Sequence, residues 1–246
     1  MNDIRHRLAR LYFYLGTYLN IFRFYEIKFL WKHLKLSKEH NIIDVACGIG
    51  VYANSLSSKV KTVTGIDFSL QSIRIAHHLK HDNMFFYQGN AEYLGHPNNS
   101  FDSAISICSL EHFSNSKKSL EEIFRILKPN GQLLITVDSL SSIDDSQFIE
   151  FHRRFCLVKK YFTVETIQNE LKDSGFEIDI VTPFMTSSFS ANACRFAFRI
   201  MKWPRILNIY SILIYPLTLF SESFSKNKSK GIIIGVYAHK PKEGNK

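Results

Sequence analysis

One segment constrains the fold of this chain more than any other: residues 42–50 read IIDVACGIG, and a helical pattern begins near Val51. The apolar β-branched run predicts a buried strand, and the two glycines predict a tight turn before the helix. Such a turn lets the backbone approach a bound molecule and points helix N-terminal N–H groups at it. The same glycines would also suit a turn that only packs a strand against a helix, so the loop alone does not define a binding site.

Short β-branched runs continue to alternate with helical patterns beyond this segment, which is typical of βαβ units around a parallel sheet. Ser119 and Glu122 have the spacing of a capping box for a helix that residues 129–131 end. Thr163 begins another helix, which Gly175 stops. Strands are predicted over residues 42–46, 62–66, 84–88, 101–107, 132–137, 176–182 and 232–239.

With 246 residues, of which 45% are hydrophobic and 22% charged, the chain suits one α/β domain with additions. An N-terminal helix is predicted because Leu8, Leu11 and Leu15 follow near-helical spacing, and packing as a lid is favoured over membrane anchoring. Four segments are predicted: an N-terminal helical lid (1–40), a core (41–183), an apolar and basic helical insertion (184–230), and the last core strand with a basic tail (231–246).

The net charge of +9 is unevenly distributed along the chain. Residues 1–40 carry eight Lys and Arg against three Asp and Glu, residues 185–246 carry ten against two, and residues 41–184 carry thirteen against seventeen. The basic ends could meet anionic lipid or nucleic acid, or could be ordinary solvated surface. Because they contain no recognised nucleic-acid-binding motif, a nucleic-acid partner is not expected.

The four cysteines lie far apart and form no CxxC pair, so neither a disulfide framework nor a metal site is expected. The N-terminus shows no secretion signal. The expected location is therefore the cytoplasm, with peripheral membrane contact left open.

A second feature specifies the kind of ligand. Asp67 ends the second predicted strand, 19 residues after Gly48, and a carboxylate there can accept both hydrogen bonds of a ribose diol or cap the next helix. A dehydrogenase would show GxGxxG after the first strand, whereas this chain reads DVACGIG. The sequence resembles class I S-adenosylmethionine-dependent methyltransferases, in their small-molecule, ubiquinone-type branch.

The resemblance covers residues 41–182, and its further segments occur in order: 65–67, 89–92, 101–102, 110–112 and 127–132. It implies a Rossmann-like α/β fold with a seven-stranded sheet, six strands parallel and the last antiparallel, and helices on both faces. It also implies S-adenosylmethionine as cofactor, S-adenosylhomocysteine as product, and no metal.

The resemblance assigns roles to individual residues. Asp44 would hold the ammonium of the methionine part, Asp67 the ribose hydroxyls, and Phe68 would pack on the adenine. Asn90 and Ala46 stand where Asp and Gly are usual, although an amide oxygen can still accept from the adenine amino group. The implied cofactor-binding residues are Asp44, Ala46, Cys47, Gly48, Gly50, Asp67, Phe68, Asn90, Ala91 and Cys108.

On the acceptor side, His112 is the predicted general base, because an attacking hydroxyl must lose its proton and imidazole titrates near neutral pH. The alternative is that His112 only shapes the pocket, since alignment alone can accelerate methyl transfer. His152 is a second catalytic candidate, in a segment interpreted as a basic loop over residues 148–161. The predicted substrate contacts are Glu111, His112, Phe113, Arg153 and Tyr161.

The expected acceptor is small, and apolar or linked to a lipid or glycan, with oxygen as the preferred nucleophile and carbon of a quinone, sterol or polyketide-like molecule as the alternative. A non-catalytic S-adenosylmethionine-binding module and a nicotinamide-dependent dehydrogenase are the rival classes. Binding of S-adenosylmethionine without any methylated product would favour the non-catalytic module. Binding of a nicotinamide cofactor would favour the dehydrogenase.

The insertion before the last strand suggests membrane contact. Its basic residues recur at three- and four-residue steps, which predicts one basic helical face, and residues 206–221 then carry no charge. These 16 residues include Pro216 and fall short of a bilayer span, so an interfacial position is predicted. The alternative is packing as a lid or dimer face. The basic residues are Arg195, Arg199, Lys202 and Arg205.

Overall fold

The structure is a computed structural model that describes residues 20–226 and 229–242. Leu8, Leu11 and Leu15, on which the predicted N-terminal helix rests, lie outside the described residues. Within the described residues, this region forms α2, Ile21–His33, which begins at the N-cap Asn20. The Asn20 side chain accepts a hydrogen bond from the Phe22 backbone N–H at 2.9 Å.

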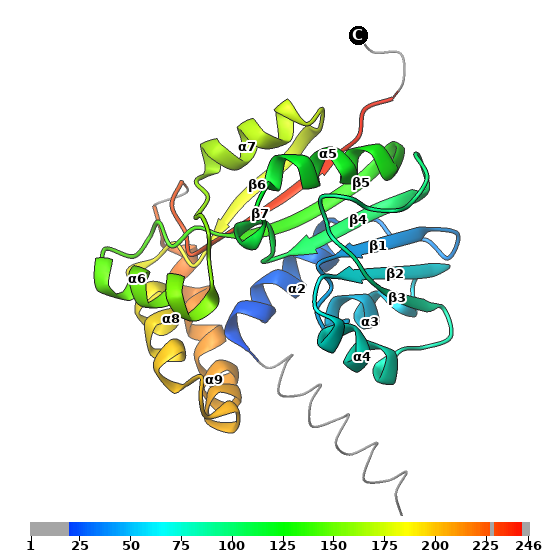
Figure 1. Ribbon diagram of the computed structural model, residues 1–246. Coiled ribbons are helices and arrows are strands. Elements are labelled where there is room, and N and C mark those ends of the chain that lie inside the picture. The colour runs from blue at the N-terminus through cyan, green and yellow to red at the C-terminus, as the bar shows by residue number, and fades with distance from the viewer. Residues whose placement is uncertain (1–19, 227–228, 243–246) are drawn as a thin grey trace, which may run out of the picture.

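The core is a seven-stranded sheet in the order β3-β2-β1-β4-β5-β7-β6 (Figure 1). Only β7 runs antiparallel, to β5 on one side and β6 on the other, while the remaining pairs are parallel. The predicted sheet of six parallel strands and one antiparallel last strand is confirmed. The strands are β1 Asn41–Val45, β2 Thr62–Asp67, β3 Met84–Gln88, β4 Phe101–Ile107, β5 Leu127–Asp138, β6 Glu177–Phe184 and β7 Ile233–His239.

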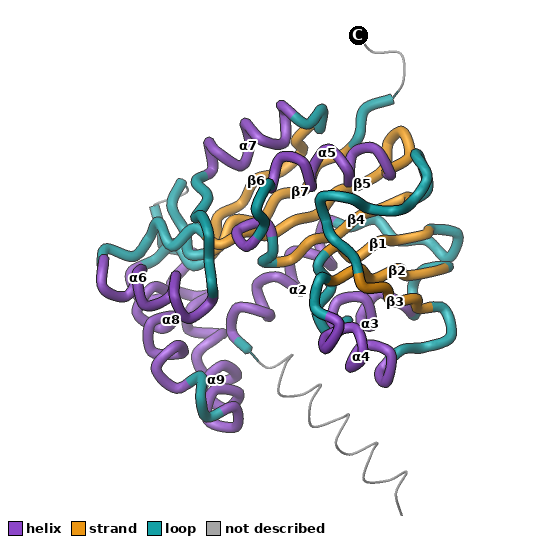
Figure 2. Tube along the Cα trace, in the orientation of Figure 1, coloured by secondary structure: helices purple, strands orange, loops and turns teal. Residues whose placement is uncertain are grey.

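Helices cover both faces of the sheet (Figure 2). Ile42 and Ile43 are adjacent in β1 and completely buried, yet they belong to opposite apolar layers, because successive strand side chains point to opposite faces. α5 and α7 contribute to the Ile43 layer, and α2, α3, α4 and α8 to the Ile42 layer. The further helices are α3 Val51–Ser57, α4 Leu70–Leu79, the short 3-10 helix η1 Leu110–His112, α5 Ser116–Ile126, α6 Ser146–Cys156, α7 Val164–Asp173, α8 Ser188–Ile200 and α9 Pro204–Ser223.

Two local predictions on helix boundaries were wrong. The N-cap of α5 is Asn115, four residues before the predicted N-cap Ser119. The Asn115 side chain accepts from the Lys118 backbone N–H at 3.0 Å, and Ser119 lies inside the helix. The helix then ends at Ile126, before the predicted stop at residues 129–131, because β5 begins directly at Leu127. The predicted helix after Thr163 is confirmed as α7, and Gly175 after it has a φ of +93°.

Two predictions on the regions around the insertion also need correction. Residues 148–161 are not simply a loop, because α6 occupies their first part after the N-cap Asp145. The proposed basic face is not continuous, because α8 ends at Ile200 and α9 starts only at Pro204. Proline lacks a backbone N–H and suits the first position of a helix, so the chain begins a new helix there. Arg195, moreover, forms an ion pair with Asp145.

Candidate functional site

A cavity of about 470 Å³ opens at the carboxyl ends of the parallel strands, where open α/β sheets bind their ligands. Its volume is within the range of small-molecule sites. Eight residues predicted to bind donor or acceptor line it. The full lining is Ala46, Ile66, Asp67, Phe68, Gly89, Asn90, Ala91, Glu92, Cys108, Ser109, His112, Phe113, Ser114 and Lys159.

Asp67 is held in place by backbone N–H groups from both sides. Gly48 donates to one carboxylate oxygen at 2.7 Å, and Ser69 donates to the other at 2.8 Å. Each carboxylate oxygen has a second lone pair, so the group can still accept from a vicinal diol in the cavity. The alternative that Asp67 only caps a helix is weakened, because the side-chain cap of α4 is supplied by Ser69.

The glycine loop shapes the cavity without lining it. Gly50 has a φ of +81°, and a Cβ there would lie 2.6 Å from the Phe86 ring, so only glycine fits without displacement. Ala46 and Cys108 follow β1 and β4 and also have positive φ values, of 59° and 45°. Such backbone strain in residues other than glycine concentrates at functional sites. Cys47, Gly48 and Gly50, which were predicted to touch the donor, are not part of the cavity lining.

The adenine side of the predicted site lies after β2 and β3. Phe68 is 77% exposed, which leaves an aromatic face at the cavity available for stacking. The Asn90 side-chain oxygen accepts from the Glu92 backbone N–H at 2.9 Å, which fixes the amide orientation. The sequence pattern did not point to Ser114 and Lys159, which also line the cavity. Lys159 donates to the Ser114 hydroxyl at 2.8 Å.

His112 lines the cavity at the end of η1. Its Nδ1 lies 3.3 Å from the Leu157 carbonyl oxygen, and because a carbonyl only accepts, Nδ1 must carry the proton in that contact. In the neutral ring, Nε2 then has the free lone pair. This tautomer is the one that a general base at this position needs.

Asp44, in β1, is 1% exposed, and its Oδ2 has no hydrogen-bond partner in the part of the chain that the structure describes. Burial, together with the nearby Asp67 carboxylate, raises the pKa of Asp44 to about 7. The group is not part of the cavity lining. A hydrogen bond with the Ala53 backbone offsets part of this pKa shift, and a cationic group or a proton near Oδ2 would stabilise the buried carboxylate further.

Beneath the cavity lies a cluster of buried polar side chains that the sequence did not predict as a unit. Glu26 from α2 is 1% exposed and accepts from Arg23 at 3.1 Å, from the Tyr52 hydroxyl, and from the Cys108 thiol at 2.7 Å. Asp138 at the end of β5 accepts from the same thiol at 3.8 Å. The N-terminal helix therefore contributes polar groups as well as apolar cover.

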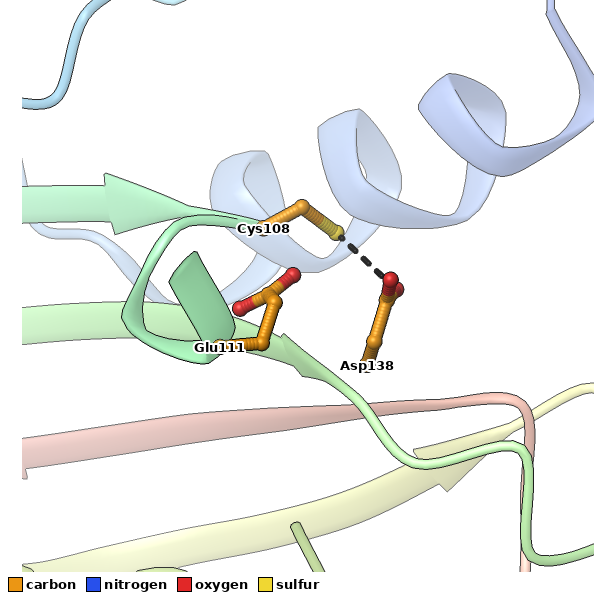
Figure 3. A group of neighbouring side chains, drawn as sticks. All are labelled: Cys108, Glu111 and Asp138. Atoms are coloured by element: carbon orange, nitrogen blue, oxygen red, sulfur yellow. Dashed lines mark hydrogen bonds between the residues drawn. The ribbon is translucent and has the colours of Figure 1, made fainter. Parts of the chain in front are cut away.

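Glu111 lies beside Cys108 and Asp138 in this cluster (Figure 3). It is completely buried, and within the described residues neither of its carboxylate oxygens has a hydrogen-bond partner. Burial and the neighbouring Asp138 carboxylate raise the pKa of Glu111 well above its ordinary value. Burial and the Glu26 carboxylate raise the pKa of Asp138 to about 7. Glu111, predicted as a substrate contact, is thus placed behind the cavity wall and not on it.

The other predicted acceptor residues also lie outside the cavity lining. His152 is 3% exposed, its Nδ1 lies 2.9 Å from the Tyr161 hydroxyl, and burial followed by repulsion from His112 lowers its pKa to about 4. Arg153 lies over the Tyr161 ring, 5.0 Å from its centroid. Of the five predicted substrate contacts, the structure brings His112 and Phe113 to the cavity.

The sheet order, the single antiparallel strand and the cavity at the carboxyl edge define the Rossmann-like methyltransferase fold. Comparison with known proteins agrees with this class. Residues 43–135 match the family described as the methyltransferase domain. The resemblance to class I S-adenosylmethionine-dependent methyltransferases that the sequence indicated is confirmed.

Among curated relatives, the uncharacterized methyltransferase YcgJ of Bacillus subtilis (strain 168) is 32% identical over 101 residues, which are 39% of this chain. The ubiquinone/menaquinone biosynthesis C-methyltransferase UbiE of Wigglesworthia glossinidia brevipalpis is 30% identical over 119 residues, which are 43% of this chain. The chain spans 40% and 48% of the lengths of these two relatives. The crystal structure of YcgJ shares the fold, with a TM-score of 0.62 and 16% identity over 89% of this chain and 99% of that one.

Proposed function

We propose that this protein is an S-adenosylmethionine-dependent methyltransferase. The observation that carries the proposal is Asp67, whose carboxylate lines the cavity at the carboxyl end of β2 while the glycine loop holds it through the Gly48 N–H. A ribose diol can donate two hydrogen bonds to it there. Phe68 and Asn90, which also line the cavity, supply an aromatic face and an amide for the adenine.

The methionine part of the donor then extends along the cavity from Ala46 towards Cys108. Its ammonium group would lie above Asp44, whose unpartnered oxygen needs a cationic neighbour. The sulfonium carbon would face His112 and Phe113. S-adenosylhomocysteine is the product that remains after transfer.

We favour oxygen as the accepting atom, with His112 as general base. In that reaction, the acceptor oxygen forms a bond to the methyl carbon, the carbon–sulfur bond breaks with its electrons going to sulfur, and the hydroxyl proton passes to Nε2. The tautomer set by the Leu157 carbonyl leaves Nε2 free for that proton. Carbon is the second candidate, because the relative UbiE is named a C-methyltransferase of ubiquinone and menaquinone biosynthesis.

Methyl transfer is tested by incubating the purified protein with S-adenosylmethionine labelled in its methyl group and with small-molecule and lipid extracts. The proposal expects label in an extracted acceptor and equimolar S-adenosylhomocysteine. Donor binding without label transfer to any acceptor class would favour a non-catalytic binding module. Comparing the metabolites and lipids of cells with and without the gene identifies the acceptor by a mass difference of one methylene.

The proposed acceptor is apolar or lipid-linked and is met at a membrane surface, with the protein otherwise cytoplasmic. The support is α9, which packs on the domain through Leu207, Ser211 and Thr218 and leaves an apolar stripe on its outer side. The spacing of the stripe follows the helical period, so it forms one face. The exposed residues of this α9 stripe are Ile206, Ile209, Leu213, Leu217 and Phe220.

The position of α9 favours lying in the interface over crossing the membrane. By length and composition α9 is apolar enough to span a bilayer, and 17% of its most apolar 18-residue stretch is buried. A spanning helix would have to leave its contacts with α2 and α8, whereas an interfacial helix keeps them. Lys202 and Trp203 precede the helix, and Trp203 is 48% exposed, which suits an interfacial aromatic group beside a cation.

Liposome flotation tests the membrane proposal with vesicles of neutral lipid alone and of neutral lipid mixed with an anionic lipid. The purified protein should float with the anionic vesicles, and the double variant Leu213→Glu/Leu217→Glu should not. Tyr87→Glu is the control, because Tyr87 is 52% exposed on the edge strand β3, outside the stripe. Failure of the wild-type protein to bind either vesicle would contradict membrane contact and leave α9 as a face for another copy of the chain.

A further inference from the structure

The buried cluster beneath the cavity contains the donor atoms of a metal site. Cys108, Glu111 and Asp138 converge on one point from the end of β4, from η1 and from the end of β5 (Figure 3). One ligand atom from each lies within 4.8 Å of the others. His152 adds a nitrogen, since its Nε2 lies 3.7 Å from Asp138 Oδ2. The sequence did not indicate this group, because its members come from four separate segments.

One of these side chains lacks the partners that a buried polar group requires. Within the described residues, neither oxygen of Glu111 has a side-chain or backbone partner at hydrogen-bond geometry, although the residue is completely buried. Among the residues that the structure describes, Arg23 forms an ion pair with Glu26, but Glu111 has no Lys or Arg partner. An unpaired buried carboxylate is far too costly to persist, so a cation or a proton must compensate it.

The orientation of His152 favours a cation over a proton. When the Tyr161 hydroxyl donates to the Ile149 carbonyl oxygen at 3.2 Å, it accepts from His152 Nδ1–H at 2.9 Å. In the neutral ring this leaves the Nε2 lone pair directed at the Asp138 carboxylate, at a distance too long for a hydrogen bond. Two electron-rich atoms facing each other in this way are typical of metal ligands, whose second ring nitrogen is held by an outer partner.

Metal–ligand bonds of about 2.0–2.3 Å place neighbouring tetrahedral ligand atoms roughly 3.3–3.6 Å apart. Cys108 Sγ lies 3.8 Å from Asp138 Oδ1, and the ligand atoms of Cys108, Glu111 and Asp138 all lie within 4.8 Å of one another. His152 lies outside that limit, with its Nε2 3.7 Å from Asp138 Oδ2, so its ring must move inward to complete a tetrahedron. Sulfur, nitrogen and carboxylate ligands together suit zinc better than magnesium or calcium, which prefer oxygen alone.

We propose that Cys108, Glu111, Asp138 and His152 bind a divalent transition-metal ion of the zinc type. Binding releases the Cys108 thiol proton, which is hydrogen-bonded to Glu26 in the metal-free protein. Because Cys108 also lines the cavity, the ion would lie at the wall of the proposed acceptor region. Four protein ligands leave a tetrahedral ion no open position for the acceptor, so the ion would hold the cavity wall in shape. The value of a fixed wall rests on the proposed methyltransferase function, whereas binding of the ion does not.

The test uses the full-length protein, stripped with a chelator and titrated with ZnCl2 and separately with CoCl2. One ion per chain is expected. Bound cobalt should show the charge-transfer absorption of a thiolate ligand, which Cys108→Ser should abolish. Cys156→Ser is the matched control and should keep the band, because Cys156 lies in α6 outside the ligand group.

Two further variants distinguish the loss of a metal ligand from a general loss of folding. Glu111→Gln removes the charge but keeps the shape, so it should raise the melting temperature of the metal-free protein and lose the rise that zinc produces in the wild type. Tyr161→Phe removes the partner of His152 Nδ1 and should weaken metal affinity about 10- to 100-fold. The proposal is overturned if the wild-type chain binds no ion, or if Cys108→Ser and Glu111→Gln bind it as tightly as the wild type. Neither readout depends on S-adenosylmethionine, so failure here is distinct from failure of the proposed function.

Discussion

Glu222 at the end of α9 links this helix to the start of α8 through hydrogen bonds. Its two carboxylate oxygens accept four hydrogen bonds at 2.7–2.9 Å, from the Thr186 N–H and hydroxyl, the Ser187 N–H and the Ser190 hydroxyl. Ser187 is the N-cap of α8, so the carboxylate also lies where the helix dipole favours negative charge. The end of one helix thus supports the start of the other.

Glu222→Gln should destabilise the protein by about 2–4 kcal/mol. One carboxylate oxygen becomes an amide NH2, which cannot accept the two hydrogen bonds made there, and the surviving bonds lose their charge assistance. α8 is part of the core through buried residues such as Ala191 and Cys194. Weakening the attachment of α8 should therefore lower the free energy of global unfolding. Urea denaturation at neutral pH measures the difference, with Glu165→Gln, on an exposed residue of α7, expected within about 0.5 kcal/mol of wild type.

The same contacts give a pH dependence with a definite sign. Burial acts to raise the pKa of Glu222, but the hydrogen bonds from Ser190, Ser187 and Thr186 outweigh it and lower the pKa. The stabilisation is therefore fully present above the ordinary glutamate pKa of about 4.3 and is lost as the pH falls through the folded-state pKa. The difference in unfolding free energy between the wild type and Glu222→Gln should therefore become smaller in acid. The reasoning would be refuted if Glu222→Gln were as stable as Glu165→Gln at neutral pH, or if this difference did not shrink in acid.

Two further predictions concern the cavity. His112→Gln should lower the rate of O-methyl transfer about 10²- to 10⁴-fold in steady-state assays, because glutamine can still donate to the Leu157 carbonyl but cannot take a proton; an unchanged rate would reduce His112 to a wall of the pocket. Gly50→Ala should destabilise the fold by about 1–3 kcal/mol in urea denaturation, because of its positive φ and the Phe86 ring. Gly95→Ala, where a Cβ meets nothing within 4 Å, is the control, and equal effects at both glycines would contradict the strain argument.

The strands could be predicted because their cause is local. Ile42 and Ile43 show the continuous apolar pattern of a strand buried on both faces, and Gly48 and Gly50 indicate the turn after β1. Helix boundaries were less certain, because Asn115 and Ser119 are both good capping residues and only the path of the chain out of η1 decides between them. At Trp203, the proline that follows was the signal for the break between α8 and α9.

The candidate site was only partly predictable for a related reason. Motif residues such as Asp67 and His112 follow strands directly, so the topology brings them to the cavity. Glu26 and His152 reach the buried cluster from helices distant in sequence, and no local pattern distinguishes them from ordinary helix residues. Tertiary packing alone decides that Glu26 points inward at Cys108. Clusters that several segments assemble therefore need the structure.

Isothermal titration calorimetry with S-adenosylmethionine and S-adenosylhomocysteine tests the central claim most directly. The wild-type protein should bind both, and Asp67→Ala should bind them about 30- to 700-fold more weakly, which corresponds to the roughly 2–4 kcal/mol of two charge-assisted hydrogen bonds. Asp82→Ala, at an exposed turn before β3, should bind as the wild type does. Thermal unfolding of each variant confirms that the glycine loop remains folded. Absence of binding by the wild-type protein, or equal affinity of folded Asp67→Ala, would contradict the account.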